Sequence, residues 1–259
     1  MMKNLMSCAK VSIEELLNKI LQRNVSLFSE DIQDHRTQIK DRVHGARVLV
    51  IGAAGSIGSA FVRQLVPYQP VAIHLVDISE NNLVEVVRDL RSSLLTLPDD
   101  FKTFAVAIGA LEFDRLLHAE QDYDYVINFS ALKHVRSEKD PFSLMRMVHT
   151  NVESVKSLLD RLVGTSTKKH FSVSSDKAAN PANIMGATKI FMERILLAYA
   201  DRIPFSTARF ANVAFPTAVF CMASCSDWQS GSHFPPHMMC NAILSLMKKR
   251  GSCVCCHAF

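Results

Sequence analysis

The chain has 259 residues, a formal net charge of +4, and 48% hydrophobic and 21% charged residues. This size and composition suffice for one large α/β domain with a small appendage. Lys and Arg form no block interleaved with aromatic residues, so nucleic acid is not an expected partner. The sequence contains neither a run of about eighteen apolar residues nor a continuous apolar stretch near its start, which predicts a cytoplasmic protein without a membrane span.

The predicted elements alternate regularly along most of the chain. Helical periodicity over 12–44 predicts two amphipathic helices, which form an N-terminal helical arm over residues 1–44. Repeated βα units from residue 45 to 215 then predict an α/β fold with a doubly wound parallel sheet. The predicted strands cover 48–51, 71–76, 104–108, 125–129 and 170–174, and the predicted helices cover 57–65, 80–95, 111–119, 141–162 and 186–201.

A glycine-rich segment joins the first predicted strand to the helix that follows it. Gly52, Gly55 and Gly58 have the spacing G-x-x-G-x-x-G, with Ser56 and Ile57 at the start of the helix. Glycine lets the backbone turn sharply and approach a pyrophosphate, whose charge the helix N-terminus stabilises. These five residues are therefore predicted to bind a dinucleotide cofactor.

Asp77 ends the second predicted strand, about 20 residues beyond the glycines. A carboxylate at this position can accept hydrogen bonds from both ribose hydroxyls and repel a 2′-phosphate, which favours NAD while leaving NADP possible. An Asp at a strand end also often caps the next helix, here near Ser79. Both interpretations stay open.

The chemistry-bearing residues follow the strand predicted at 170–174. Segment 174–181 reads Ser-Ser-Asp-Lys-Ala-Ala-Asn-Pro, and segment 185–189 reads Met-Gly-Ala-Thr-Lys. Together they resemble the active-site block of the UDP-N-acetylglucosamine 4,6-dehydratases, the CapD-like polysaccharide biosynthesis proteins among the extended short-chain dehydrogenase/reductases. Segments 130–135, 138–141 and 209–213 resemble other parts of this family, and the similarity runs from about 32 to 215. The resemblance implies a Rossmann-like fold, a UDP-sugar substrate and a homo-oligomer in the full-length family.

The resemblance also implies an internal redox cycle, in which NAD takes the C4 hydride, water leaves from C5 and C6, and the hydride returns to C6. Lys177 is the expected base at C5 and Asp176 the expected acid at C6, while Ser175 stands where the family usually has Thr and would bond the C4 oxygen. Lys189 matches the lysine of the Tyr-x-x-x-Lys element and would hold the nicotinamide ribose. Met185 occupies the tyrosine position, so Asp176 or a water would have to replace the usual base for C4.

Four more residues enter through the same resemblance. Ser130 and Ala131 are expected at the cofactor, and Lys133 and Asn212 at the substrate. Each site residue also has an ordinary interpretation, since neighbouring Asp and Lys are common at surfaces and a Lys at a helix start is usually solvated. Their common place at strand ends favours the functional interpretation.

The composition changes abruptly near residue 215, after a strand around 209–213. Six of the seven cysteines follow residue 215, and Asp227 is the only carboxylate beyond it. Reading each codon of 216–224 one base earlier permits Ser-Asp-Gly-Ser-Leu-Leu-His-Gly-Phe, which resembles the family at this position. In the same shifted frame, 237–244 and 247–257 can also encode sequences that resemble the family. Residues 216–259 are therefore predicted to be an out-of-frame tail without a domain of its own, so that the C-terminal substrate lobe is missing or disordered.

Two alternatives for the cysteines are less favoured. Structural zinc sites use paired C-x-x-C-like knuckles, which the tail lacks, so no metal is expected. Disulfides are not expected because nothing indicates export. The functional hypotheses are a nucleotide-sugar 4,6-dehydratase, an epimerase of the same fold, and a non-catalytic NAD-binding remnant.

Overall fold

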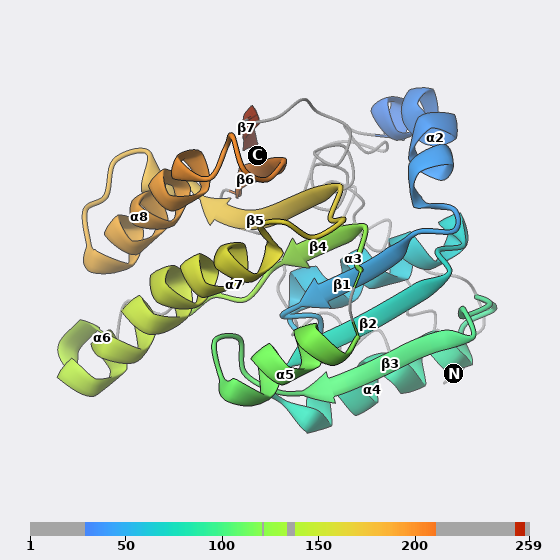
Figure 1. Cartoon of the computed structure of the whole chain (residues 1–259), viewed down its shortest axis with the longest axis horizontal. Helices are drawn as coiled ribbons and strands as arrows, with labels where there is room; N and C mark the ends of the chain where they lie inside the picture. Colours follow the sequence, from blue (N-terminus) through green and yellow to red (C-terminus); the bar gives the residue numbers. More distant parts are fainter. Residues whose placement is uncertain (1–28, 121, 134–137, 211–251, 257–259) are drawn as a thin grey trace, which may run out of the picture.

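The computed structural model describes residues 29–120, 122–133, 138–210 and 252–256. An all-parallel seven-stranded sheet lies at its centre, in the order β3-β2-β1-β4-β5-β6-β7 (Figure 1). Its strands are β1 (Arg47–Ile51), β2 (Ala72–Asp77), β3 (Asp100–Ala105), β4 (Tyr125–Asn128), β5 (Lys169–Ser175), β6 (Phe205–Phe210) and β7 (Ser252–Cys256). The strand order reverses between β1 and β4, which confirms the predicted Rossmann-like doubly wound sheet.

Helices cover both faces of this sheet (Figure 1). They are α2 (Ser29–Val43), α3 (Ser56–Leu65), η1 (Val66–Tyr68), α4 (Glu80–Ser92), α5 (Leu111–Ala119), α6 (Pro141–Val148), η3 (His149–Glu153), α7 (Ser154–Leu162), η4 (Asp176–Ala178) and α8 (Ile184–Ala198). Alternate residues of a strand point to opposite faces, so Val48 and Val50 of β1 pack with α2, α3 and α4. Leu49 and Ile51 pack with α5, α7 and α8 on the other face.

The structure corrects several predicted boundaries. The strand predicted at 104–108 lies at Asp100–Ala105, because it is a half-exposed edge strand whose charged residues hide the apolar pattern. The last strand before the tail is Phe205–Phe210 rather than 209–213. The helix predicted over 141–162 contains the π-helical turn η3 between α6 and α7. The first helix of the predicted arm lies outside the described residues, as does most of the predicted tail, from which β7 alone is described.

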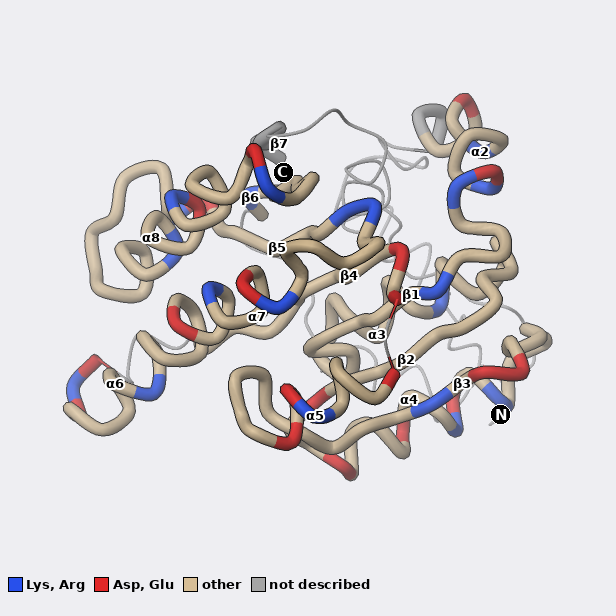
Figure 2. The backbone as a smooth tube through the Cα atoms, in the orientation of Figure 1, with Lys and Arg blue, Asp and Glu red and all other residues tan. Residues whose placement is uncertain are grey.

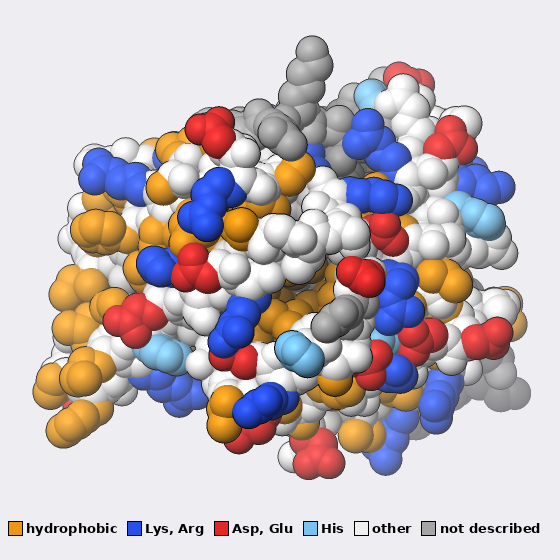
Figure 3. Space-filling view, in the orientation of Figure 1, with side chains coloured by type: hydrophobic (Ala, Val, Ile, Leu, Met, Phe, Trp, Pro, Cys, Tyr) orange, Lys and Arg blue, Asp and Glu red, His pale blue; other side chains and the backbone are white. Residues whose placement is uncertain are grey.

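Charged residues keep to the margins of the sheet. Strands β1, β4 and β5 carry Lys or Arg only at their first residue or not at all (Figure 2). Apolar side chains gather over α6 and α8 at the left of the space-filling view (Figure 3). The exposed large apolar residues of these helices include Phe142 and Met145 of α6 and Phe191 and Leu197 of α8. None of the helices in the described residues is long and apolar enough to cross a membrane.

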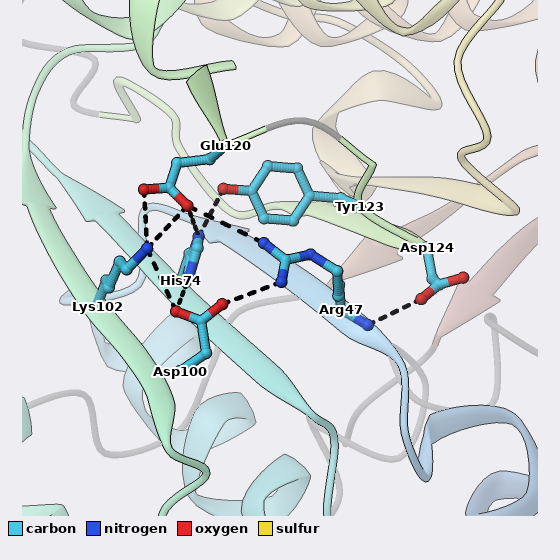
Figure 4. A network of polar contacts seen from close by, with 7 residues as sticks. All are labelled: Arg47, His74, Asp100, Lys102, Glu120, Tyr123 and Asp124. Atoms are coloured by element: carbon cyan, nitrogen blue, oxygen red, sulfur yellow. Dashed lines mark hydrogen bonds and ion pairs between the residues drawn. The ribbon is translucent and has the colours of Figure 1, made fainter. Parts of the chain in front are cut away.

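A polar network ties β1, β2 and β3 together at their amino ends (Figure 4). The fully buried imidazole of His74 lies 3.0 Å from an Asp100 oxygen and 2.7 Å from the Tyr123 hydroxyl. Arg47 pairs with the second Asp100 oxygen at 3.0 Å. Lys102 donates to both oxygens of Glu120 at 2.9 Å. We call these six residues the amino-end network; it lies at the opposite edge of the sheet from the glycine-rich segment.

Asp100→Asn should lower the free energy of unfolding by about 1 kcal/mol at neutral pH, a value reduced for the partial solvent exposure of this carboxylate. The hydrogen bond from His74 is the largest cause that lowers the pKa of Asp100 from 3.8 to about 2. Because the folded-state pKa is depressed, the stabilisation is present above about pH 4 and is lost as the pH falls toward 2. Denaturant unfolding of wild type and variant should therefore differ at neutral pH and converge near pH 2; an equal difference at both would contradict this role.

Candidate functional site

The predicted site residues meet at the carboxyl edge of the sheet. Neighbouring strands β1 and β4 pair Ile51 with Asn128, and β4 and β5 pair Asn128 with Ser172. The segments that leave these three strands therefore emerge side by side. In open α/β sheets ligands bind at this edge, beside the point where the strand order reverses.

The glycine-rich segment forms a tight backbone cradle at the start of α3. Gly52 has φ +72°, and a Cβ there would lie 2.6 Å from Ser130 N. A Cβ on Gly58 would lie 2.2 Å from the Gly52 carbonyl oxygen, whereas one on Gly55 would meet its nearest atom at 3.4 Å. Gly55 caps α3 without a side-chain hydrogen bond, and Ser56 and Ile57 follow as its first residues. A helix N-terminus without a side-chain cap, next to glycine backbone, fits the pyrophosphate of a dinucleotide.

Gly58→Ala should lower the free energy of unfolding by about 3 kcal/mol, because its Cβ would meet backbone that no rotamer change can move aside. The matched control is Gly164→Ala, where φ is +84° but no atom lies within 4 Å of the new Cβ. Backbone strain alone should cost the control about 1 kcal/mol. Chemical denaturation measures both, and equal losses would show that the close approach of the helix to the loop does not need glycine.

Asp77 connects the glycine cradle to the turn after β2. One carboxylate oxygen accepts a hydrogen bond from Ala54 N and the other accepts one from Ser79 N, both at 3.0 Å. The helix α4 is capped by Ser79, which accepts from Asn82 N, and not by Asp77. Asp77 therefore holds the loop in place rather than capping the helix, and its carboxylate lies at the cradle.

The loop after β4 is held from two sides. The Asn128 side chain accepts hydrogen bonds from Ser130 N at 2.9 Å and from Ser130 Oγ at 2.6 Å. Asn151, buried in η3, accepts from Leu132 N, donates to the Leu132 carbonyl and donates to Thr188 Oγ1 of α8. Sequence reasoning missed Asn151, although π-helical turns are frequent at functional sites. The available signal was a polar residue on the apolar face of the helix predicted over 141–162.

The remaining predicted contacts of this loop are only partly placed. Ala131 is half-buried and Lys133 is exposed at the end of the described loop. Asn212 lies outside the described residues. Within the described part of the chain, no three His, Cys, Asp or Glu side chains are grouped so that they could hold a metal ion.

Ser175, Asp176 and Lys177 form a connected set where β5 ends and η4 begins. Ser175 Oγ and Lys177 N each donate to Asp176 Oδ1 at 2.8 Å, and Lys177 Nζ lies 3.3 Å from the same oxygen. Burial raises the pKa of Asp176, but the hydrogen bonds from Ser175 and Lys177 outweigh it and the pKa is lowered overall. Asp176 is therefore ionised at neutral pH and must gain a proton before it can act as an acid.

Lys189 is buried beneath this set and is not the solvated lysine expected of an ordinary helix start. Its side chain is 4% exposed, and Nζ donates to the Val173 carbonyl of β5 at 3.1 Å. Burial lowers the pKa of Lys189 to about 8, and the nearby Glu193 charge opposes that shift. One helical turn earlier, Met185 is also buried, and its backbone N donates to Glu138 Oε1 at 2.8 Å.

The first turn of α8 packs directly against η4. A Cβ on Gly186 would lie 2.7 Å from the Lys177 carbonyl oxygen. This close approach brings the segments of Lys177 and Lys189 together, although the two residues are separated in sequence by a loop. The fold thus joins the predicted catalytic residues into one site at the carboxyl end of β5.

The sheet and the glycine-rich loop at its carboxyl edge define a Rossmann-like doubly wound α/β fold. Residues 48–217 match the family described as "Polysaccharide biosynthesis protein", and the chain belongs to that family. The match ends close to the change in composition near residue 215.

Individual relatives agree with this assignment. The chain is 34% identical over 70% of its length to an uncharacterized membrane protein of Methanocaldococcus jannaschii, covering 52% of that protein. It is 30% identical over 66% of its length to a UDP-N-acetylglucosamine 4,6-dehydratase (inverting) of Campylobacter jejuni, covering 50% of it. The chain thus spans about half the length of these relatives. The Bordetella bronchiseptica enzyme WbmF in complex with NAD+ has a similar fold, with TM-score 0.53, 23% identity, and coverage of 66% of this chain and 51% of that one.

Proposed function

We propose that residues 45–215 carry the cofactor-binding and catalytic part of a nucleotide-sugar 4,6-dehydratase that acts on UDP-N-acetylglucosamine in polysaccharide biosynthesis. The observation that carries this proposal is the connected set of Ser175, Asp176 and Lys177 at the end of β5, with Lys189 buried beside it. The named dehydratase of Campylobacter jejuni supports the same reaction class, and family membership supports a role in polysaccharide biosynthesis.

NAD is the proposed cofactor. The backbone cradle of Gly52, Gly55 and Gly58 would hold its pyrophosphate, and Asp77 would face the adenosine ribose. The bound cofactor would supply a reversible hydride acceptor for C4 of the sugar. Lys189 would hold the nicotinamide ribose, and the fold similarity to an enzyme crystallised with NAD+ supports this choice.

Ser175, Asp176 and Lys177 can together move every proton that the reaction needs. As C4 is oxidised, its hydroxyl proton passes to Ser175 Oγ, whose own proton passes to the ionised Asp176 along their 2.8 Å hydrogen bond. This relay replaces the tyrosine that Met185 cannot supply, and it leaves Asp176 protonated. Lys177 then takes the C5 proton, a role that requires its amine to be unprotonated when the elimination begins.

The same groups complete the elimination and return to their starting states. Asp176 gives its proton to the departing C6 hydroxyl, which leaves as water. The Lys177 ammonium would then give its proton back to C5 as C6 is reduced. The lowered pKa of Asp176 suits this sequence, because the carboxylate must begin ionised in order to accept the first proton.

The tail motivates a second candidate, a non-catalytic NAD-binding remnant. The family match ends at 217, beyond which Asp227 is the only carboxylate side chain and six of the seven cysteines follow. We propose that a one-base shift near the Phe215 codon put the remaining residues out of frame. The region that would complete the UDP-sugar site would then be absent from the chain as written.

One experiment tests both candidates. The 259-residue chain and a version with one base restored after the Phe215 codon are purified and assayed for a 4-keto sugar product from UDP-N-acetylglucosamine. Turnover by the restored version alone would support the dehydratase and make the present chain a remnant. Turnover by neither folded protein would overturn the substrate assignment, and a 4-epimer product would replace the dehydratase with an epimerase.

A further inference from the structure

A buried carboxylate beneath the site takes no part in the proposed chemistry. Glu193 of α8 accepts a hydrogen bond from Ser174 Oγ at 2.6 Å. Its two oxygens also accept from Arg209 of β6, from Nε at 2.9 Å and from Nη2 at 2.6 Å. The side chains of Glu193 and Arg209 are 11% and 25% exposed. One carboxylate thus joins α8 to both β5 and β6.

Packing alone does not explain a charged bridge at this position. Apolar side chains of similar volume often stabilise a protein as well as a buried ion pair does, because taking two charges out of water is costly. The place of the bridge suggests another role. Glu193 lies one helical turn after Lys189, on the same side of α8. Its partner Ser174 lies between Val173, whose carbonyl holds Lys189, and Ser175.

We propose that Glu193 is a positioning residue for Lys189, fixing its helix against the end of β5 and keeping its buried amine charged. This inference rests on the proposed function, in which Lys189 holds the cofactor ribose. Ser174 and Arg209 both donate to the Glu193 carboxylate, and the Ser174 hydrogen bond would still hold it in place without Arg209. The pair would therefore belong to the cofactor site although neither residue reaches the cofactor.

The charged residues around Lys189 determine how its pKa should change when one of them is replaced. Burial lowers the pKa of Lys189 to about 8, and Glu193 is the charged group that opposes this. Arg209 faces the same region from β6, while Asp176 and Lys177 lie on η4, which packs against α8. Removing the Glu193 charge leaves Arg209 to repel the Lys189 ammonium, so the pKa of Lys189 should fall. Removing the Arg209 charge should raise it.

The test compares Glu193→Gln with Arg209→Met in the 259-residue chain. The Lys189 ammonium is titrated by heteronuclear NMR, with its signal assigned by loss in Lys189→Met. Glu193→Gln should lower the titration midpoint by about one pH unit and Arg209→Met should raise it, since a neighbouring charge commonly shifts a pKa by this amount or more. Glu193→Asp should restore most of the wild-type midpoint, and the exposed control Glu85→Gln should leave it unchanged.

Binding of NAD, followed by calorimetry over the same pH range, separates this inference from the proposed function. NAD affinity should decline as the pH rises and Lys189 loses its charge. If this decline begins at a lower pH in Glu193→Gln than in wild type, both the inference and the cofactor assignment are supported. Absence of NAD binding by the wild type would overturn the cofactor assignment, while the NMR midpoints would still decide the role of Glu193. The inference would be overturned if the Lys189 titration midpoint is the same as in wild type in both Glu193→Gln and Arg209→Met. If one of these variants fails to fold, the direction in which the other moves the midpoint decides the question.

Discussion

Lys177→Met in the frame-restored chain is expected to reduce formation of the 4-keto-6-deoxy product by about 10³-fold, because the base for C5 is lost. The variant keeps Ser175 and Asp176, which accept the C4 proton, so oxidation at C4 should still occur. Reduced nicotinamide should therefore accumulate after substrate is added, and its near-ultraviolet absorbance measures this directly. A variant that merely disturbed the fold would lose both signals.

The matched control for this variant lies at the opposite end of the same strand. Lys168 precedes β5 and pairs with Asp124 at 2.9 Å, with its side chain 63% exposed. Lys168→Met makes the same chemical change far from the carboxyl edge and should leave turnover unchanged. Normal product formation by Lys177→Met would remove this lysine from the reaction and require another base at C5.

Lys189→Met is expected to raise the free energy of unfolding by up to about 3 kcal/mol below pH 8, since a pKa lowered from 10.5 to about 8 corresponds to a cost of that order. The loss of a partner for the Val173 carbonyl reduces the gain. Because the folded-state pKa lies below the unfolded value, the unfolded chain binds more protons between about pH 8 and 10.5. Wild-type stability should therefore rise with pH across this window, and the advantage of the variant should fade there.

Denaturant unfolding from neutral to alkaline pH measures this effect. Lys156→Met serves as a control, because Lys156 is a 58% exposed lysine that pairs with Asp160 on α7. Its change in stability should be small and should not show the same dependence on pH. A loss of stability in Lys189→Met at neutral pH would mean that the buried amine stabilises the fold rather than being kept for binding.

The parts of the fold that local patterns encode were predictable. The glycine spacing, the strand before it and the helix after it are contiguous in sequence, so the backbone cradle followed directly. The start of Asp100–Ala105 was misplaced because an edge strand buries too few side chains to leave a clear apolar alternation. The π-helical turn His149–Glu153 has no apolar period of its own and was assigned to a continuous helix.

Contacts between distant segments explain what the sequence could not reveal about the site. In the sequence, Glu193 looks like a solvated helix residue. Only the fold shows that Arg209 of β6 pairs with it. Asn151 contacts the loop at Leu132 only because the fold brings that loop against η3. Lys189 was predicted from its motif, but its burial and its altered pKa depend on packing between α8 and β5.

The π-helical turn between α6 and α7 has a consequence for insertions and deletions. Such a turn holds about one residue more than an α-helical turn, so removing one residue would restore a continuous α-helix and leave α6 in nearly the same rotation relative to α7. Phe142 and Met145, which are 78% and 68% exposed, would keep their direction. Asn151 lies inside the turn and would lose its alignment with Leu132 and Thr188. A one-residue deletion here would therefore disturb the loop at Leu132 and leave the exposed face of α6 in place.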